Sequence, residues 1–195
     1  MISGIVLAGG TSSRLGRPKQ LLDLEGRPVL QHVVDAAVDA GLDEVVVVLG
    51  HMADEIGSAI TLPPQARTCV NPHYAQGQST SLRAGLSAAD PRSEAAVILL
   101  GDQPRMRPDL IRAVVDAYRE TGGRVVRAWY GGRPAHPVVF DRSVWENLQA
   151  VEGDRGARDL LKAHPEWEVR VDAGDESPGD LDTWEDYERL RSGGA

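Results

Sequence analysis

The residues whose types and spacing could do chemistry lie first in one glycine-rich stretch near the N-terminus. An apolar run, Ile5–Ala8, ends directly in Gly9-Gly10. Basic side chains then follow at three positions, Arg14, Arg17 and Lys19. Glycines can adopt positive φ and allow backbone N–H groups to approach a small anion. The short, branched apolar run is typical of a buried strand. The stretch therefore predicts a phosphate-binding loop at the end of a first strand.

This stretch matches neither of the two common glycine loops. The P-loop motif requires a lysine directly after its last glycine, but here Lys19 comes three places after Gly16. The dinucleotide-binding motif requires one residue between its first two glycines, but Gly9 and Gly10 are adjacent. A plain Gly-Gly turn beside solvated arginines is the alternative. Against it, only Lys19 and Lys162 among the 21 basic residues are lysines. An ammonium is a compact point charge, which suits a phosphate.

Composition limits the classes of protein that the chain can belong to. At 195 residues, 42% hydrophobic and 26% charged, the chain is expected to form one globular domain. A net charge of −8 argues against nucleic acid or an anionic membrane as the main partner. Cys69 is the only cysteine, so an intramolecular disulfide is excluded and a reducing compartment is expected. Neither a signal peptide nor a membrane-spanning stretch is recognisable, which predicts a cytoplasmic protein.

Apolar runs alternate with helical patterns along most of the chain. Strands are predicted at Ile5–Ala8, Glu44–Leu49, Thr68–Asn71, Ala95–Leu100 and Val169–Val171, and helices at 28–41, 51–60, 80–89, 108–118, 143–151, 155–164 and 183–190. This alternation predicts an α/β fold with a mainly parallel sheet that is covered on both sides. In the last third, Arg124–Tyr130 and Pro137–Phe140 flank Gly131-Gly132 and predict a small hairpin-like β insertion.

Candidate ligand-binding residues follow several of the predicted strands. In open parallel sheets, ligands bind outside the carboxyl ends of the strands, so Gly9-Gly10, Asn71 and Asp102 are expected to share one crevice. Asp102 suits Mg²⁺, which prefers one or two carboxylates together with phosphate oxygens. A simple turn aspartate before Pro104 is the alternative role.

Later polar segments have both a functional and a structural interpretation. Asp182 and Thr183 each begin a capping-box pattern, so spacing favours a helix cap over a metal ligand at Asp182. The segment 76–81 could cap a helix or hydrogen-bond a nucleobase through Ser81. Two arginines in the segment 153–158 could grip a second anionic substrate or form surface ion pairs. His136 is a candidate contact or proton carrier, or a structural histidine beside proline.

Segments over almost the whole chain resemble one enzyme family. They are Leu7-Ala8-Gly9-Gly10-x-Ser12-x-Arg14-x-Gly16-x-x-Lys19, Asn71-Pro72 with 77–82, Gly101-Asp102-Gln103-Pro104, His136-Pro137-Val138-Val139-Phe140, Gly153-Asp154-x-Gly156-Ala157-Arg158 and Asp180-Leu181-Asp182-Thr183. The chain resembles nucleotidyltransferases that activate small phosphorylated substrates with an NTP. Within these, it is most similar to the molybdenum cofactor cytidylyltransferase branch.

The resemblance implies a Rossmann-like three-layer αβα fold in a single domain, 1–195. Residues of about 1–105 would bind nucleotide and those of about 106–195 would bind the acceptor. Catalytic roles are implied for Arg14, Lys19 and Asp102; nucleotide contacts for Leu7, Ala8, Gly9, Gly10, Arg14, Lys19, Asn71 and Ser81; Mg²⁺ ligation for Asp102 and Asp182; and acceptor contacts for His136, Asp154 and Arg158.

The expected activity is Mg²⁺-dependent transfer of CMP from CTP to a small phosphorylated acceptor, with molybdopterin as the expected acceptor and a molybdoenzyme as a possible partner. Two segments depart from the cytidylyl pattern. Ala8-Gly9-Gly10 stands where Ala-Ala-Gly is usual, which is typical of guanylyl relatives, and Pro134-Ala135 stands where Arg-Gly is usual before the His-Pro pair. GMP transfer from GTP, another phosphorylated acceptor, or a cofactor carrier without turnover are the alternatives. Intact Arg14, Lys19 and Asp102 argue against a mere carrier.

Overall fold

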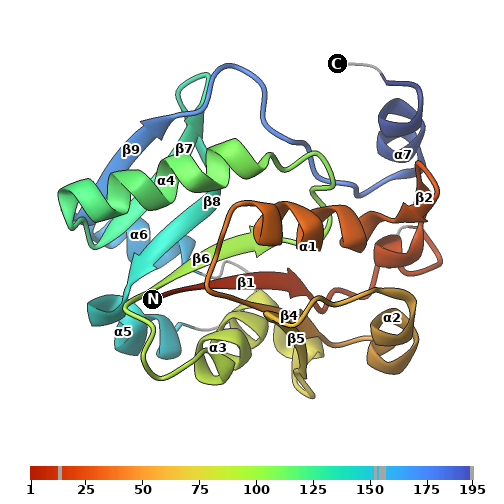
Figure 1. The fold of residues 1–195 in the computed structure, drawn as a ribbon, viewed down its shortest axis with the longest axis horizontal. Coiled ribbons are helices and arrows are strands. Elements are labelled where there is room, and N and C mark those ends of the chain that lie inside the picture. The colour runs from red at the N-terminus through yellow and green to blue at the C-terminus, as the bar shows by residue number, and fades with distance from the viewer. Residues whose placement is uncertain (13–14, 152, 154–156, 194–195) are drawn as a thin grey trace.

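The computed structural model describes residues 1–12, 15–151, 153 and 157–193, which are arranged around one mixed β-sheet (Figure 1). The strands of this sheet are β1 (Ile2–Ala8), β4 (Glu44–Leu49), β5 (Ala66–Val70), β6 (Ala95–Leu100), β7 (Val125–Tyr130), β8 (Arg133–Asp141) and β9 (Glu168–Asp172). A short separate hairpin consists of β2 (Asp23–Leu24) and β3 (Arg27–Pro28).

The α-helices are α1 (Val29–Asp39), α2 (Ala53–Ala59), α3 (Gln78–Ala88), α4 (Pro108–Thr121), α5 (Trp145–Gln149), α6 (Arg158–Ala163) and α7 (Trp184–Arg191). Short 3-10 helices are η1 (Lys19–Leu21), η2 (Tyr74–Gln76), η3 (Arg142–Val144) and η4 (Pro165–Trp167). Helix ends follow the predicted signals. Pro28 precedes α1, and Gly41, with φ of 80°, lies just beyond its end.

The strand order, β5-β4-β1-β6-β8-β7-β9, creates a topological switch point next to β1. β1 pairs in parallel with β4 on one side and with β6 on the other. After β1, the chain first adds β4 on one side of it and later adds β6 on the opposite side. The carboxyl ends of β1 and β6 form the kind of crevice where open α/β sheets bind ligands.

Helices cover both faces of the sheet and so confirm the three-layer α/β fold (Figure 1). Side chains of α1 and α4 pack on one face, whereas those of α3, α5 and α6 pack on the other. β4 and β6 lie between these layers, which explains why their sequences are almost continuously apolar. Each fully buried Leu, Ile or Val contributes about 1.5–3 kcal/mol to the stability of this core.

The predicted β hairpin exists, but it extends the main sheet and is not a separate insertion. β7 and β8 pair antiparallel, and their connecting residues Gly131-Gly132 have φ of 51° and 77°. β8 also pairs antiparallel with β6, with Phe140 opposite Ala96. The run from Pro137 to Phe140 is buried because pairing with β6 places it inside the sheet, where helices cover both faces.

A third apolar cluster joins the loop after β1 to the C-terminal helix. It contains Leu15, Leu22, Leu24, Val29, Leu181 and Tyr187. The Tyr187 hydroxyl also donates a hydrogen bond to the Asp23 carbonyl, with 2.6 Å between the oxygens. Segments more than 160 residues apart in sequence are thereby held side by side, next to the crevice at the end of β1.

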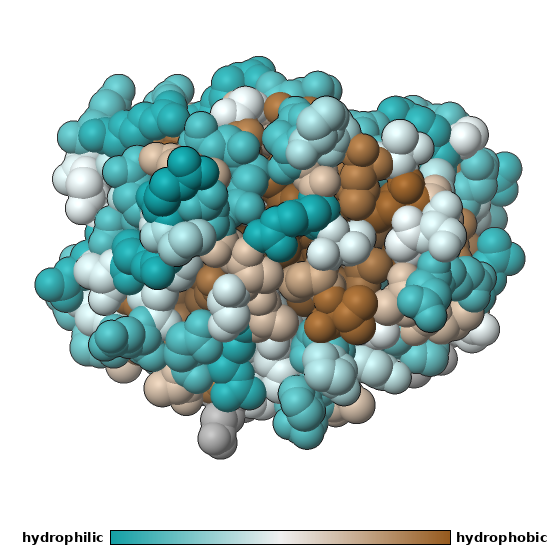
Figure 2. Space-filling view, turned by 60° about the horizontal axis from the view of Figure 1, so that its bottom comes forward, coloured by the Kyte–Doolittle hydropathy of each residue, from teal (hydrophilic) through white to brown (hydrophobic). Residues whose placement is uncertain are grey.

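The molecular surface shows a mixture of side chains. On the face in Figure 2, apolar residues gather near the centre and hydrophilic residues surround and interrupt them. In the described parts of the chain, the structure contains no helix with the length and apolar character that crossing a membrane requires.

We predict that Gly85 in α3 and Gly57 in α2 respond in opposite ways to alanine. A Cβ at Gly85 would overlap Ile5 Cγ2 and lie 3.0 Å from Val48 Cγ2. Gly85→Ala should therefore lower the free energy of unfolding by about 1–3 kcal/mol, the usual cost of overpacking. A Cβ at Gly57 would meet Leu49 Cδ1 at an ordinary 3.4 Å. Gly57→Ala should be neutral or stabilising by up to about 1 kcal/mol, because alanine favours helix.

Urea unfolding of both variants measures these free energies, with Gly57→Ala as the matched control. A Gly85→Ala protein as stable as the wild type would contradict the close packing of α3 on β1 and β4.

Candidate active site

A cavity of about 410 Å³ lies at the carboxyl ends of β1 and β6. Its lining residues are Leu7, Ala8, Gly9, Gly10, Thr11, Lys19, Gln20, Tyr74, Ala75, Gly77, Gln78, Ser81, Leu100, Gly101 and Asp102. We call it the nucleotide pocket, because most of the nucleotide-contacting residues predicted from the sequence line it. The structure thus brings the glycine-rich stretch and the residues after β6 into one crevice, as the positions of the strand ends predict.

The glycines after β1 do not use the positive φ that glycine can adopt. Neither Gly9 nor Gly10 has a left-handed backbone, although both line the pocket. A Cβ at Gly9 would instead lie 3.0 Å from Ser81 Oγ, whereas a Cβ at Gly10 would meet nothing within 4 Å. Gly9 allows the hydroxyl of Ser81 to approach β1 closely, and Gly10 leaves space in the pocket.

The Lys19 ammonium lies between two carboxylates at the edge of this pocket. Lys19 Nζ is 2.5 Å from Asp102 Oδ2 and 2.8 Å from Asp182 Oδ1. The Lys19 and Asp102 side chains are only 14% and 19% exposed, whereas that of Asp182 is 47% exposed. Charge-assisted hydrogen bonds of this kind are stronger than neutral ones, and low exposure strengthens them further. The ion pairs of Lys19 therefore connect the beginning of the chain to Asp102 in its middle and to Asp182 near its end.

The environment favours the charge of the lysine and disfavours that of Asp102. Burial lowers the pKa of Lys19, but the charges and hydrogen bonds of Asp102 and Asp182 outweigh it, so the pKa is raised. Burial raises the pKa of Asp102, Lys19 opposes that effect, and the nearby charges of Asp180 and Asp182 add to the rise. Additional positive charge beside Asp102 would stabilise its carboxylate.

Asp182 is not the helix cap that spacing alone favoured. Thr183 is the N-cap of α7, and a complete capping box links its hydroxyl and backbone N–H to Asp186. The overlapping pattern that begins one residue earlier is not used for capping. Consequently, the carboxylate of Asp182 projects from the residue before the cap and reaches Lys19.

Backbone and side-chain contacts fix the separation of the two carboxylates. The Leu181 N–H donates to the carbonyl of Asp102 with an N···O distance of 3.0 Å. Gln103 Nε2 donates to Asp180 Oδ1 at 2.7 Å. The fully buried side chain of Leu181 anchors this segment in the third apolar cluster.

Asp102 and Asp182 fit a divalent metal ion. Asp102 Oδ1 is buried and has no hydrogen-bond partner among the described residues, so one ligand atom remains to be satisfied. Within those residues, no group of three or more His, Cys, Asp or Glu side chains is placed to hold a metal. Two carboxylates fit Mg²⁺, whose remaining positions are usually filled by waters and phosphate oxygens.

Gln20 is a pocket residue that the sequence interpretation missed. Its side chain is 2% exposed, and its Nε2 donates to the Ala8 carbonyl at 2.9 Å. The Lys19 backbone N–H donates to Ser12 Oγ at 3.0 Å. These bonds fold the loop back onto the end of β1 and bring Lys19 over the pocket. A second polar residue directly after the lysine, immediately before Leu21-Leu22, was the available signal.

Asn71 lies behind the pocket wall, whereas Ser81 lines the pocket. Asn71 is 2% exposed, and its Nδ2 donates to Thr80 Oγ1 at 2.8 Å and to Ser81 Oγ at 3.0 Å. The N-cap of α3 is Gly77, which has no capping side chain. No side chain of the segment 76–81 therefore caps α3, and Asn71 holds the Ser81 hydroxyl beside the pocket.

The remaining predicted site residues are dispersed. Arg14 and Asp154 lie outside the described residues. Arg17 lies 5.8 Å from the centroid of the Trp184 ring and does not line the nucleotide pocket. His136 and Arg158 line a second, smaller pocket. Burial lowers the pKa of His136 to about 4, and the positive charge of Arg127 contributes, so His136 is neutral at neutral pH.

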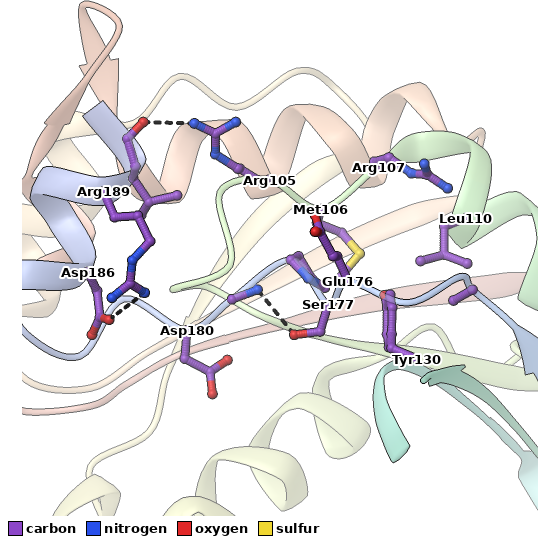
Figure 3. A pocket seen from close by; sticks show the side chains of 14 residues that line it. Arg105, Met106, Arg107, Leu110, Tyr130, Glu176, Ser177, Asp180, Asp186 and Arg189 are labelled. Atoms are coloured by element: carbon purple, nitrogen blue, oxygen red, sulfur yellow. Dashed lines mark hydrogen bonds and ion pairs between the residues drawn. The ribbon is translucent and has the colours of Figure 1, made fainter. Parts of the chain in front are cut away.

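A further cavity of about 600 Å³ lies beside the segment that leads to Asp182 (Figure 3). It shares no lining residue with the nucleotide pocket. Two of its three arginines have partners that also line the cavity. Arg105 Nη2 donates to the Leu190 carbonyl at 2.8 Å, and Arg189 Nη1 lies 3.4 Å from Asp186 Oδ1, as the dashed lines show. This cavity contributes no side chain to the Lys19 cluster.

Comparison with known proteins assigns the family. The model of the "MobA-like NTP transferase domain" matches residues 4–168. The chain belongs to this family. Among relatives of this MobA-like protein, nicotine blue oxidoreductase of Paenarthrobacter nicotinovorans is 34% identical, over 97% of this chain and 96% of that protein. The purine catabolism protein PucB of Bacillus subtilis is 30% identical, over 96% and 95% respectively.

Solved structures agree with this family assignment. Rv0371c from Mycobacterium tuberculosis H37Rv has a TM-score of 0.88 and 34% identity, and the similarity covers 98% of this chain and 97% of that chain. A structure of Rv0371c in complex with manganese has a TM-score of 0.83 and 31% identity, with 98% of each chain covered. The MobA-like fold is therefore shared with a protein that binds a divalent metal.

We predict that Lys19→Met binds Mn²⁺ more tightly than the wild type when no nucleotide is present. The Lys19 ammonium occupies positions on both carboxylates that a metal ion would use, so its removal should increase affinity by about tenfold or more, which corresponds to about 1.4 kcal/mol. Electron paramagnetic resonance of free Mn²⁺ measures the dissociation constant. Lys162→Met, which changes the only other lysine, controls for net charge. Equal affinities in all three proteins would refute competition between Lys19 and the metal.

Proposed function

We propose that this MobA-like NTP transferase moves a nucleoside monophosphate from an NTP to a phosphate of a small acceptor, with Mg²⁺ as the cofactor. One observation supports this most: Lys19 Nζ lies within 2.8 Å of both Asp102 and Asp182 at the edge of a glycine-lined pocket. A lysine and two carboxylates that meet in this way suit a triphosphate and its metal ion. The manganese complex of Rv0371c is consistent with a divalent metal in this family.

In the proposed reaction, an oxygen of the acceptor phosphate attacks the α-phosphorus in line with the leaving group. The new P–O bond forms as the bond to the bridging oxygen of the β-phosphate breaks, and pyrophosphate leaves. Lys19, and Arg14 from its position in the motif, would neutralise charge on the phosphates. A bound Mg²⁺ would supply further charge neutralisation. Asp102 and Asp182 would hold it, and Gly10 would leave room for the phosphates. Positioning and electrostatics thus supply the catalysis.

CMP is the favoured nucleotide and GMP the alternative. The branch that the chain resembles uses CTP, whereas Gly9 matches guanylyl relatives. Ser81 Oγ lines the pocket close to Gly9 and is held by Asn71, which makes this pair the proposed neighbours of the base. Molybdopterin is the proposed acceptor, and a molybdoenzyme that receives the product is the proposed partner. Residues of about 1–105 would serve the nucleotide and those of about 106–195 the acceptor.

The name of one relative supports a second candidate function. Nicotine blue oxidoreductase matches 97% of the chain, and its name describes an oxidation or reduction of nicotine blue. NADH consumption without release of pyrophosphate would favour an oxidoreductase. Cofactor binding with neither reaction would favour a carrier. The Lys19, Asp102 and Asp182 cluster favours nucleotidyl transfer, since neither alternative requires a site for a metal-bound triphosphate.

We expect Lys19→Ala and Asp102→Ala each to reduce the rate of nucleotidyl transfer by about a hundredfold or more, the usual effect of losing one preorganised electrostatic contact. Release of pyrophosphate from CTP or GTP in the presence of Mg²⁺ and molybdopterin measures the rate. Lys162→Ala should retain the wild-type rate, because Lys162 is exposed on α6 and outside the nucleotide pocket. Near-full turnover by either pocket variant would disprove the proposed roles.

We expect Gly9→Ala to change the preference between CTP and GTP by about tenfold or more, within the range of about 1–3 kcal/mol for one added carbon in a pocket. The new Cβ would lie 3.0 Å from Ser81 Oγ and displace the hydroxyl that Asn71 orients. Titration calorimetry with each Mg-nucleotide measures the preference. Tripolyphosphate, which has no base, should bind equally to both proteins. An unchanged CTP/GTP ratio would exclude Gly9 and Ser81 as neighbours of the base.

A further inference from the structure

A second pocket adjoins the nucleotide pocket on the face of the sheet that α3 and α6 cover. The two pockets share Leu7 and Gln78 in their walls. The other residues that line the second pocket are Leu82, Ile98, Arg127, His136, Val138, Phe140, Ala157, Arg158 and Leu161. Its volume is about 100 Å³. A water molecule in the liquid occupies about 30 Å³, so the pocket has room for one compact group rather than for a whole cofactor.

Arg127 carries a poorly neutralised charge in this pocket. It projects from β7, its side chain is 15% exposed, and its Nε donates to the Ala135 carbonyl at 3.4 Å. Its Nη1 lies 3.8 Å from Glu168 Oε2, which is a loose ion pair. Burial lowers the pKa of Arg127. The charge of Glu168 opposes this effect, whereas that of Arg158 adds to it. The charge of the buried guanidinium is therefore only partly compensated by the single nearby carboxylate of Glu168.

Glu168 is shared among several donors. Its Oε1 accepts a hydrogen bond from Trp129 Nε1 at 2.7 Å and lies 3.7 Å from Arg170 Nε. One carboxylate is thus divided between an indole and the guanidinium groups of Arg127 and Arg170. Because its single negative charge is shared, a cationic excess remains on the pocket side of Glu168.

Arg158 adds a second guanidinium to the same pocket. It is the first residue of α6, it is exposed, and it has no ion pair with any described residue. Two arginines that converge on one small pocket repel each other unless an anion lies between them. Apolar walls from Leu82, Phe140 and neighbouring residues reduce the local dielectric and strengthen any such contact.

We infer that Arg127 and Arg158 form an anion subsite, and that the acceptor consequently carries two anionic groups. This inference rests on the proposed function. One group, the phosphate that attacks, would lie near Lys19 in the nucleotide pocket. The second, a phosphate, a carboxylate or the dithiolate of molybdopterin, lies between Arg127 and Arg158, and the connecting part of the acceptor lies over Leu7 and Gln78. The neutral imidazole of His136 serves as a hydrogen-bonding group there and not as a counter-charge. Acceptors with a single anionic group are poor substrates.

Calorimetric titration of inorganic phosphate and of acetate into the free protein tests the subsite. Arg127→Met and Arg158→Met should each weaken binding of the better probe by about tenfold or more, as expected for a lost charge-assisted hydrogen bond. Arg170→Met is the matched control, since it removes the same charge beside the same Glu168 but outside the pocket, and it should bind like the wild type. Because Arg158 is exposed, its variant remains informative even if Arg127→Met folds poorly.

Unchanged affinity for both probes in Arg127→Met and Arg158→Met would overturn the inference, since it would mean that these anions bind elsewhere, for instance beside Lys19. The proposed function is tested separately by the rise in melting temperature with Mg-CTP or Mg-GTP, which all four proteins should share. A nucleotide shift without an arginine-dependent anion site refutes only the subsite. An arginine-dependent anion site without any nucleotide shift would count against nucleotidyl transfer.

Discussion

The structure depends most on a single partly buried cluster, the Lys19 ammonium between the carboxylates of Asp102 and Asp182. These residues come from the loop after β1, the loop after β6 and the residue before the N-cap of α7, and no local interaction could bring them together. Removal of one partner from such a cluster leaves a charge without compensation, which is costly where exposure is low. The same contact underlies the proposed chemistry. A metal ion could replace the Lys19 ammonium on the two carboxylates, and the ammonium could then contact the triphosphate. Fold and proposed activity therefore rest on the same atoms.

The rest of the fold holds this contact in place. The strand order puts the ends of β1 and β6 side by side, so Gly9-Gly10 and Asp102 line the same pocket. The third apolar cluster ties the Lys19 loop to the segment that carries Asp182. Gln20 bonds the loop back to the end of β1. Rigid elements thus fix the positions of the charges, while Gly9, Gly10, Asp102 and Asp182 themselves lie on the connecting loops.

Local patterns predicted much of this arrangement, but not the parts decided by distant contacts. The buried strands β1, β4 and β6, the ends of α1 and the crevice beyond the sheet followed from apolar runs and helix-end residues. Spacing alone gave the wrong role for Asp182, because Asp182 and Thr183 begin equally good capping patterns. In the structure, Thr183 caps α7 and Asp182 contacts Lys19, which is 163 residues away. The hairpin of β7 and β8 was predicted, but its membership in the main sheet depends on pairing with β6. Gln20 belongs to no recognisable motif, and only its contact with the Ala8 carbonyl gives it a place in the pocket.

The most direct test of the central claim is an anomalous diffraction measurement on crystals soaked with Mn²⁺ and the non-hydrolysable CTP or GTP analogue that stabilises the protein more. We predict a manganese peak in contact with Asp102 and Asp182, with Lys19 Nζ moved from both carboxylates to the phosphate oxygens of the analogue. A manganese peak elsewhere, or Lys19 still between Asp102 and Asp182 with the analogue bound, would contradict the account.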